Sequence, residues 1–337
     1  MESKERVKRA IEFNNPDRPP ICGGPYSDIV RICGYENWLE TDWKYNDTLK
    51  KHERRDEWGC IHRIAEIKGS HYHIETNPLH DWSALATYRF PPATNIDRKL
   101  PRIKEYIEKE GKGEKYVEAA MDPGPYLVMT NLKEHENMLM DFHFNMPKII
   151  GLYNRIVDYY IMMVEKVKNL GVHCVTFYED WGTTRGMICS PQMWEKNFKP
   201  VSKRLIDSVH GLGLHFGWQV SGNVGEELLR HMADMGVDLL DEYQPNVKGI
   251  DVLGRTLRGK VCLLTCIDEV KTFERGTPED VEKEAKLLIE KMDCNGAGLI
   301  FRPNLPGQNP SPEKIKKINV LHNVVHSYCC LPPVKEL

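Results

Sequence analysis

The hydrophobic pattern becomes regular after about residue 115, where short apolar runs alternate with longer amphipathic segments. Short runs rich in β-branched and aromatic residues are typical of buried strands, and apolar residues at every third or fourth position are typical of helices. Seven strands are predicted, beginning near residues 19, 116, 172, 214, 237, 261 and 297. Helices are predicted at 3–13, 147–169, 191–211, 225–235 and 278–292, with a last one after Ser311.

Strands that alternate with helices predict a parallel sheet covered by helices. We therefore expect one domain over residues 1–337, an α/β fold with a single (β/α)₈ TIM barrel, although the pattern places only seven of its eight strands. The competing architecture is an open, doubly wound sheet. It is disfavoured because no Gly-x-Gly-x-x-Gly follows the first strand.

Residues 30–110 have a different character, with many Trp, His and charged residues and little long periodicity. We interpret them as an N-terminal elaboration within the same domain. The stretch from His62 to Glu75 alternates in the manner of a hairpin that turns at Gly69-Ser70.

Composition excludes several classes of protein. The net charge of −3 offers no basic surface for nucleic acid, and no apolar stretch has the length of a membrane span. The chain begins with charged residues rather than a secretory signal, and its ten cysteines include no Cys-x-x-Cys pair. These features favour the reducing cytoplasm.

Acidic residues stand where predicted strands end. In a barrel these ends meet at one face, where catalytic residues gather. We predict four catalytic acids: Asp122, Glu179, Asp180 and Glu242. The alternative for one of Glu179 and Asp180 is that it only caps a turn or pairs with a loop cation such as Arg185. Substrate-binding candidates at the same ends are aromatic or polar: Tyr178, Trp181, Trp218, Gln219, Ser221, Tyr243 and Asn304. The four aromatic residues have an alternative role in the barrel core.

A metal site is a further hypothesis. Glu179, Glu242 and Cys266 could together hold Zn²⁺, but other trios at these ends could do so too, and no spacing forms a metal motif. The alternative for Cys266 is a small residue packed within its strand.

Several short segments follow one another in an order that spans nearly the whole chain. They include Asn15-Pro-Asp-Arg-Pro-Pro20, Asp56-Glu-Trp-Gly-Cys60, Glu179-Asp-Trp-Gly-Thr183, Ser190-Pro-Gln-Met-Trp194, Ser221-Gly-Asn223 and Gly276-Thr-Pro-Glu-Asp-Val281. In these segments the chain resembles the uroporphyrinogen decarboxylase superfamily. The resemblance implies a single (β/α)₈ barrel with its active site at the carboxyl ends of the strands.

The branches of that superfamily carry different motifs, and these motifs can be compared with the equivalent positions of this chain. The decarboxylases carry Arg-Gln-Ala-Gly-Arg after the first strand to bind substrate carboxylates, whereas this chain has Cys22-Gly-Gly-Pro-Tyr26, without arginine. Methyltransferases that act on coenzyme M bind zinc through His-x-Cys-Gly and a later cysteine. Here the equivalent positions are Gln219-Val-Ser221-Gly222 and a place near Asn304, so all three ligands are replaced.

The remaining similarity is to corrinoid-dependent methyltransferases that demethylate aryl methyl ethers. It implies transfer of the methyl group of a methylated small molecule to the Co(I) corrinoid (cobalamin) of a separate corrinoid protein, which docks at the barrel mouth. Glu179, Asp180, Glu242 or a metal that they hold would then stabilise the phenolate leaving group. A methylated amine or thioether donor, a lyase or decarboxylase acting on a small carboxylic acid, and a binding protein remain alternatives. The formation of a homodimer also stays an open question.

Overall fold

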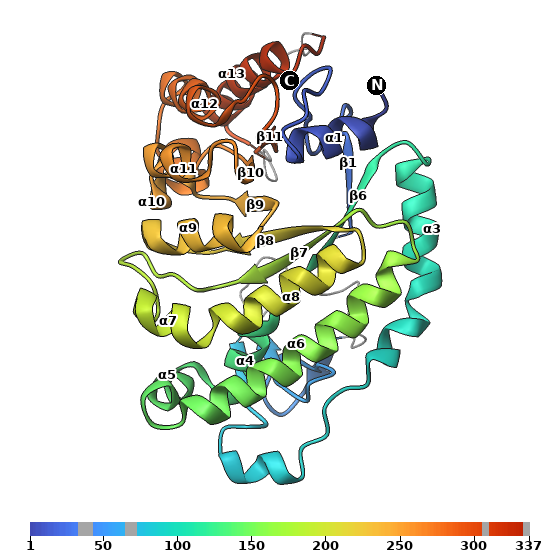
Figure 1. Cartoon of the computed structure of the whole chain (residues 1–337), viewed down its shortest axis with the longest axis vertical. Coiled ribbons are helices and arrows are strands. Elements are labelled where there is room, and N and C mark those ends of the chain that lie inside the picture. Colours follow the sequence, from blue (N-terminus) through green and yellow to red (C-terminus); the bar gives the residue numbers. More distant parts are fainter. Residues whose placement is uncertain (33–42, 65–72, 305–309, 333–337) are drawn as a thin grey trace.

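The computed structural model describes residues 1–32, 43–64, 73–304 and 310–332. Its central feature is a seven-stranded parallel sheet in the order β1-β6-β7-β8-β9-β10-β11 (Figure 1). The strands are β1 (Ile29–Ile32), β6 (Tyr116–Met121), β7 (Cys174–Glu179), β8 (His215–Val220), β9 (Leu239–Glu242), β10 (Cys262–Thr265) and β11 (Leu299–Phe301).

The sheet is curled. Strands β1 and β9 are four positions apart, which is about 19 Å in a flat sheet with strands ~4.8 Å apart. Nevertheless Arg31 Nη2 on β1 lies 2.9 Å from Asp241 Oδ2 on β9. At the other edge, Ile21 forms a parallel bridge with Phe301 of β11. The fold is therefore TIM-barrel-like, with the segment around Ile21 beside the last strand.

The strand predicted near residue 19 is thus one bridged residue, and the sheet uses a strand that the periodicity did not predict. This strand, β1, lies, apart from its first residue, inside the range 30–110 interpreted as an elaboration. Its apolar run is only four residues long and is interrupted by Arg31. Such a short, charged run gives too weak a pattern for a strand to be recognised.

Helices surround the sheet in Figure 1. They are α1 (Ser3–Ile11), α3 (Leu100–Gly111), α4 (Pro125–Lys133), α5 (His135–Phe144), α6 (Met146–Lys168), α7 (Pro191–Asn197), α8 (Lys199–Gly211), α9 (Gly225–Met235), α10 (Pro245–Lys248), α11 (Ile250–Leu257), α12 (Pro278–Met292) and α13 (Pro312–Tyr328). Shorter helical turns are η1 (Trp82–Ala86), η2 (Ala93–Arg98) and η3 (Glu269–Glu274). The helix predicted at 191–211 is divided in two at Phe198, because Pro200 favours the first turn of a new helix. In the described ranges, no helix combines the length and apolarity of a membrane span.

Residues 44–76 contain a separate antiparallel sheet in the order β2-β3-β4-β5. Its strands are β2 (Lys44–Asn46), β3 (Lys51–Arg55), β4 (Ile61–Ile64) and β5 (His73–Thr76). Strands β4 and β5 pair where the hairpin was predicted. The turn at Gly69-Ser70 lies outside the described residues.

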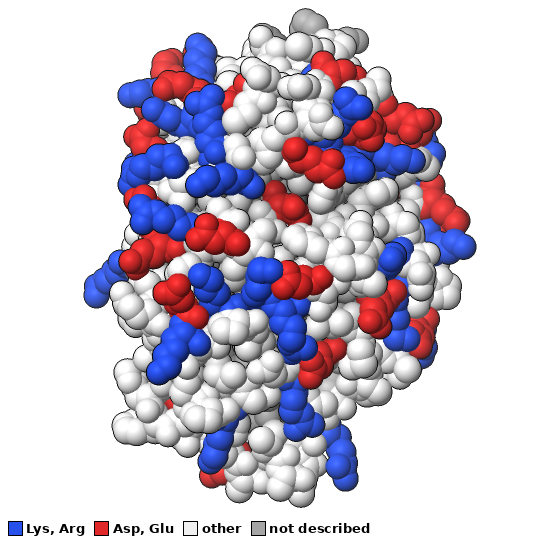
Figure 2. Space-filling model, viewed as in Figure 1, with Lys and Arg blue, Asp and Glu red and all other residues white. Residues whose placement is uncertain are grey.

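Helix α1 closes the amino end of the curled sheet. Its Val7 and Ile11 pack with inward-facing strand residues such as Cys174, Leu239 and Leu264. On the surface, charges of both signs are intermixed (Figure 2), as the small net charge suggests.

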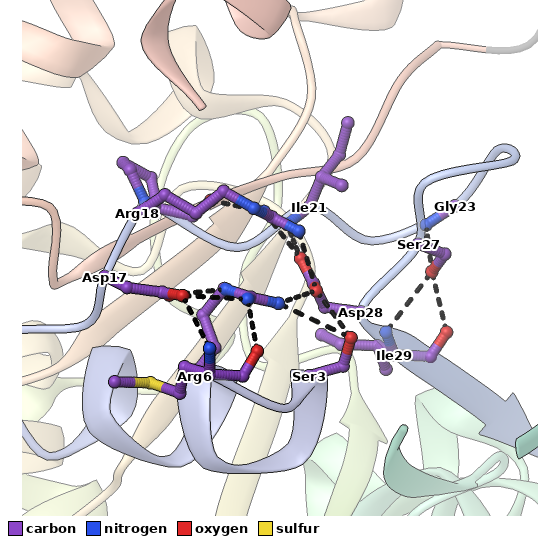
Figure 3. Close-up of polar contacts among 11 residues, drawn as sticks. Ser3, Arg6, Asp17, Arg18, Ile21, Gly23, Ser27, Asp28 and Ile29 are labelled. Atoms are coloured by element: carbon purple, nitrogen blue, oxygen red, sulfur yellow. Dashed lines mark hydrogen bonds and ion pairs between the residues drawn. The ribbon is translucent and has the colours of Figure 1, made fainter. Parts of the chain in front are cut away.

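An ionic network fastens α1 to the chain before β1 (Figure 3). Arg6 contacts Asp17 and Asp28, each at 2.7 Å, and Arg18 contacts Asp28 at 2.9 Å. The same Asp28 carboxylate accepts a bond from Ile21 N at 3.0 Å. Asp28 therefore holds the bridged segment, α1 and the start of β1 together.

Candidate active site

A group of polar side chains meets on the concave side of the sheet. We call Arg31, Glu118, Tyr178, Asp241, Tyr243 and Arg302 the inner cluster. They come from β1, β6, β7 and β9 and from the residues that follow β9 and β11. Arg31 holds Glu118 with two hydrogen bonds, Nε to Oε2 at 2.9 Å and Nη2 to Oε1 at 3.0 Å.

Asp241 is the centre of the inner cluster. It accepts from Arg31 at 2.9 Å, from Arg302 at 2.9 Å and from the Tyr178 hydroxyl at 3.0 Å. The Arg302 guanidinium lies 3.8 Å from the centroid of the Tyr243 ring, within cation–π range. These contacts fix both tyrosines beside two guanidinium groups.

The charges of the inner cluster balance, with two arginines against two carboxylates. The acids lie deeper, with 1% of Glu118 and 0% of Asp241 exposed, compared with 11% and 16% for Arg31 and Arg302. Burial alone would raise the pKa of Asp241, but the two arginines outweigh it and hold that pKa below its usual range. Sequence analysis predicted acids, and no arginine, as catalytic residues at the strand ends. The structure instead offers guanidinium groups on the side nearer solvent.

Glu179, one of the predicted catalytic acids, has its carboxylate occupied. Its Oε1 accepts from Tyr126 N at 3.0 Å, which caps the first turn of α4, and its Oε2 accepts from Trp181 Nε1 at 2.7 Å. Burial raises the pKa of Glu179 to about 8, although both hydrogen bonds oppose the rise. The Glu179 carboxyl group therefore joins the loop after β6 to the loop after β7.

Glu242 is similarly engaged. It pairs with the buried Lys248 and accepts from Gln244 N at 2.6 Å. Lys248 also donates to the carbonyl oxygens of Val220 and Gly222, at 2.6 Å and 2.9 Å. This pair fastens the end of β8 to the end of β9.

The predicted zinc trio is not assembled. Among residues 1–32, 43–64, 73–304 and 310–332, no three His, Cys, Asp or Glu side chains form a group that could hold a metal ion. Glu179 and Glu242 are occupied as described, and the Cys266 thiol contacts Tyr243 O at 3.5 Å. Burial raises the pKa of Cys266 to about 12, whereas a metal-bound cysteine is a thiolate. These three residues do not fit a zinc ion.

Asp122 and Asp180 form a different kind of pair. They follow β6 and β7 directly, and both are half-buried. Burial raises the pKa of Asp122 to about 6, and the charge of Asp180 adds to the rise. A carboxyl group with this pKa can exchange a proton near neutral pH, so Asp122 suits general acid–base chemistry.

The predicted substrate-binding aromatic residues divide into two groups. Tyr178 and Tyr243 belong to the inner cluster and are half-buried. Trp181 and Trp218, which are 0% and 2% exposed, pack in the core between the sheet and its helices. The ring centroids of Trp181 and Tyr126 are 4.0 Å apart. The two tryptophans thus have the alternative role, packing in the core, and not the predicted role in substrate binding.

The polar substrate-binding candidates differ in how fully their side chains are already hydrogen-bonded. Gln219 contacts Ser221 at 3.2 Å through its side-chain amide. Asn304 is buried and makes two hydrogen bonds to Ile267, accepting from its N at 3.1 Å and donating to its O at 2.8 Å. Asn304 therefore fixes the loop after β10, and its amide is not directed at a ligand.

Sequence analysis did not predict four members of the inner cluster as site residues: Arg31, Glu118, Asp241 and Arg302. A signal for the two acids was available, because a carboxylate inside an apolar strand requires a buried partner. Nothing in the sequence marked Arg31 as that partner.

An open groove lies beside the ends of β7 and β8 and has a volume of about 810 Å³. It is lined by residues of α5, α7 and α9 and of the loops after these strands, including Phe142, Met187, Ile188, Met193 and Val224. No residue of the inner cluster lines it. The groove is thus a separate surface at the same end of the sheet.

This geometry defines an α/β protein with a TIM-barrel-like sheet and a polar cluster toward the carboxyl ends of its strands. The sequence model of the uroporphyrinogen decarboxylase (URO-D) family matches residues 63–328. The chain therefore belongs to the URO-D family.

Comparison with one solved structure, a methyltransferase, supports the fold. A methyltransferase from Methanosarcina mazei superposes with a TM-score of 0.71 at 15% identity, over 97% of this chain and 99% of the other. A B12-independent methionine synthase from Shewanella sp. W3-18-1 gives a TM-score of 0.47 at 12% identity, over 68% and 66% of the two chains. At these identities the likeness concerns the fold alone. No curated protein sequence matches the chain.

Proposed function

We propose that this protein is a methyltransferase that demethylates a methoxylated aromatic compound and passes the methyl group to the Co(I) corrinoid of a separate protein. The observation that carries the proposal is the inner cluster, in which two tyrosines stand beside charges that cancel one another. A neutral aromatic molecule suits these surroundings. The URO-D family membership and the M. mazei methyltransferase fold are consistent with the proposal.

The alternative of porphyrinogen decarboxylation requires groups that bind several carboxylates at once. The segment Cys22-Gly-Gly-Pro-Tyr26 contains no arginine. Arg31 and Arg302, the arginines of the inner cluster, are already paired with Glu118 and Asp241. Diverting them to a substrate would leave buried carboxylates without partners, which is strongly unfavourable. The geometry therefore favours a substrate without clustered negative charges.

The chain's own residues would bind and orient the donor. Tyr178 and Tyr243 offer ring faces and hydroxyl groups beside the substrate, and Asp122 can hold or move a proton at the strand ends. The reduced corrinoid would supply the nucleophile that accepts the methyl group. The enzyme itself needs no nucleophilic side chain.

The groove beside β7 and β8 is our candidate docking surface for the corrinoid protein. On α5, next to the residues that line the groove, Met140 and Phe144 are 53% and 81% exposed. The face over α5 in Figure 2 carries few charges. Exposed apolar side chains beside a groove are typical of protein interaction sites. We also propose that the barrel is closed, with the Ile21 segment as its eighth strand.

Incubation of the purified protein with methoxyarenes and a reduced corrinoid protein tests the function. Release of the corresponding phenol, with methylation of the corrinoid, is expected. Demethylation of an amine or thioether, and not of an ether, would show that the proposed class of methyl donor is wrong. Release of carbon dioxide from a carboxylic acid, without methyl transfer, would assign the protein to the lyases.

A further inference from the structure

The two tyrosine hydroxyl groups of the inner cluster differ in their hydrogen bonding. The Tyr178 hydroxyl donates to Asp241 at 3.0 Å and accepts from Arg31 Nη1 at 3.1 Å. The Tyr243 hydroxyl lies 3.4 Å from both Arg31 Nη1 and the Tyr178 oxygen, at the outer limit of a hydrogen bond. Within the described ranges, Tyr243 donates to no carboxylate or carbonyl oxygen. Because the Tyr178 proton is donated to Asp241, the Tyr243 proton is directed at most to the Tyr178 oxygen at 3.4 Å, a weak contact that a ligand oxygen can replace.

Two guanidinium groups lie beside Tyr243, and the charge of the Asp241 carboxylate also acts on its hydroxyl group. Arg31 lies beside the Tyr243 oxygen, and the Arg302 guanidinium lies 3.8 Å from the centre of the Tyr243 ring. The carboxylates that balance these arginines are deeper, since Glu118 and Asp241 are almost completely buried. An oxygen that gained negative charge next to Tyr243 would have the Arg31 and Arg302 guanidinium groups beside it. Fixed charges and dipoles of this kind stabilise charge that develops in a transition state.

The protonation state of Tyr243 is suited to donation. Burial raises the pKa of its hydroxyl group, the charge of Asp241 adds to the rise, and together they outweigh the lowering by Arg302 and Arg31. The hydroxyl thus remains protonated through the neutral range. It can offer a hydrogen bond without first taking up a proton.

We propose that Tyr243 donates the hydrogen bond that stabilises the leaving oxygen of the methyl donor, with Arg31 and Arg302 as positioning residues. This role rests on the proposed demethylation. The bond between the aryl oxygen and the methyl carbon breaks, both electrons stay on oxygen, and the methyl group passes to the Co(I) corrinoid. The phenolate takes up one proton from solvent as it departs. Tyr243 keeps its own proton, so it needs no regeneration.

Demethylation kinetics of Tyr243→Phe test this role, because the substitution removes the hydroxyl and keeps the ring under Arg302. The control is Tyr328→Phe, which removes a hydroxyl that donates to Asp293 at 2.7 Å outside the inner cluster. A series of methoxyarenes whose phenols differ in acidity is the substrate set. We expect kcat to fall roughly 10²-fold for the least acidic phenol and much less for the most acidic. An equal loss for every ether, or no loss, would overturn the role.

A binding experiment gives a readout that needs no corrinoid. Titration of 4-nitrophenol bound to the protein, followed by the absorbance of its phenolate, reports the pKa of the bound phenol. We expect that pKa to be lower than in free solution for the unmodified protein and for Tyr328→Phe, and to rise in Tyr243→Phe. Failure of 4-nitrophenol to bind, or an identical pKa in all three proteins, contradicts the inference.

The two proposals fail in different ways. If the unmodified protein releases no phenol from any methoxyarene, the proposed function is wrong and the catalytic role falls with it. If it demethylates ethers and Tyr243→Phe matches it throughout the series, only the role of Tyr243 is wrong.

Discussion

Replacing Asp241 with asparagine should destabilise the protein strongly. Asp241 is 0% exposed and accepts from Arg31, Arg302 and Tyr178 at 2.9–3.0 Å. Asparagine has the same shape, but it has only one accepting oxygen and turns a donor toward a guanidinium group. Arg31 keeps its two bonds to Glu118. The loss therefore falls mainly on Arg302, which is left without a compensating charge.

Removing one partner of a buried ion pair costs about 3–5 kcal/mol. This is a large share of a typical free energy of unfolding, ~5–15 kcal/mol. The measurement is the free energy of unfolding from reversible urea titration at neutral pH. Asp158→Asn is a matched control, because Asp158 pairs with Arg204 at 2.6 Å while both side chains are substantially exposed. We expect at most about 1 kcal/mol for the control.

A double variant isolates the cause. Asp241→Asn with Arg302→Met removes both the carboxylate and the cation that it leaves unpaired. The double variant should recover part of the lost stability, with a coupling of about 0.5–3 kcal/mol. If Asp241→Asn costs no more than Asp158→Asn, or if the two losses simply add, the reasoning about an unpaired guanidinium is wrong.

The same variant has a defined pH dependence. Because Arg31 and Arg302 hold the pKa of Asp241 below its usual range, its contribution is complete above about pH 4 and is lost as pH falls through that lowered pKa. The stability difference between the unmodified protein and Asp241→Asn should therefore shrink in acid. A difference that stays constant down to the acid transition argues against the ion pairs.

Three further substitutions have defined outcomes. Burial raises the pKa of Glu179 to about 8, so this carboxyl group binds a proton more tightly in the folded protein than in the unfolded chain. The free energy of unfolding should therefore fall as pH rises toward 8. Glu179→Gln should flatten this part of the curve of stability against pH. Asp122→Asn should remove the limb of the activity–pH profile near pH 6, where Asp122 titrates, and an unchanged limb would exclude Asp122 as its source. A Cβ on Gly217 would lie 2.2 Å from Thr176 Oγ1, so Gly217→Ala should cost about 1–3 kcal/mol in a urea titration, and a neutral result would show that the strands can separate locally.

The candidate site could be predicted only in part. Acids at strand ends were recognised because a strand that stops at an acid is visible in the sequence. Neighbouring residues on a strand point to opposite faces, so Tyr178 and Glu179 could not both belong to the inner cluster. The sequence does not say which face is concave. It therefore predicted Glu179 and Trp218 as site residues together with Tyr178.

The sequence by itself determined the alternation of strands and helices, since periods of two and 3.6 residues are local properties of the chain. It also carried the resemblance that family membership later supported. Only the tertiary structure decided the pairing of Arg31 with Asp241, which are on strands four positions apart. The curl of the sheet brings them together, and this curl depends on the packing of the whole chain. Balanced charges beside two tyrosines are therefore a property of the folded sheet.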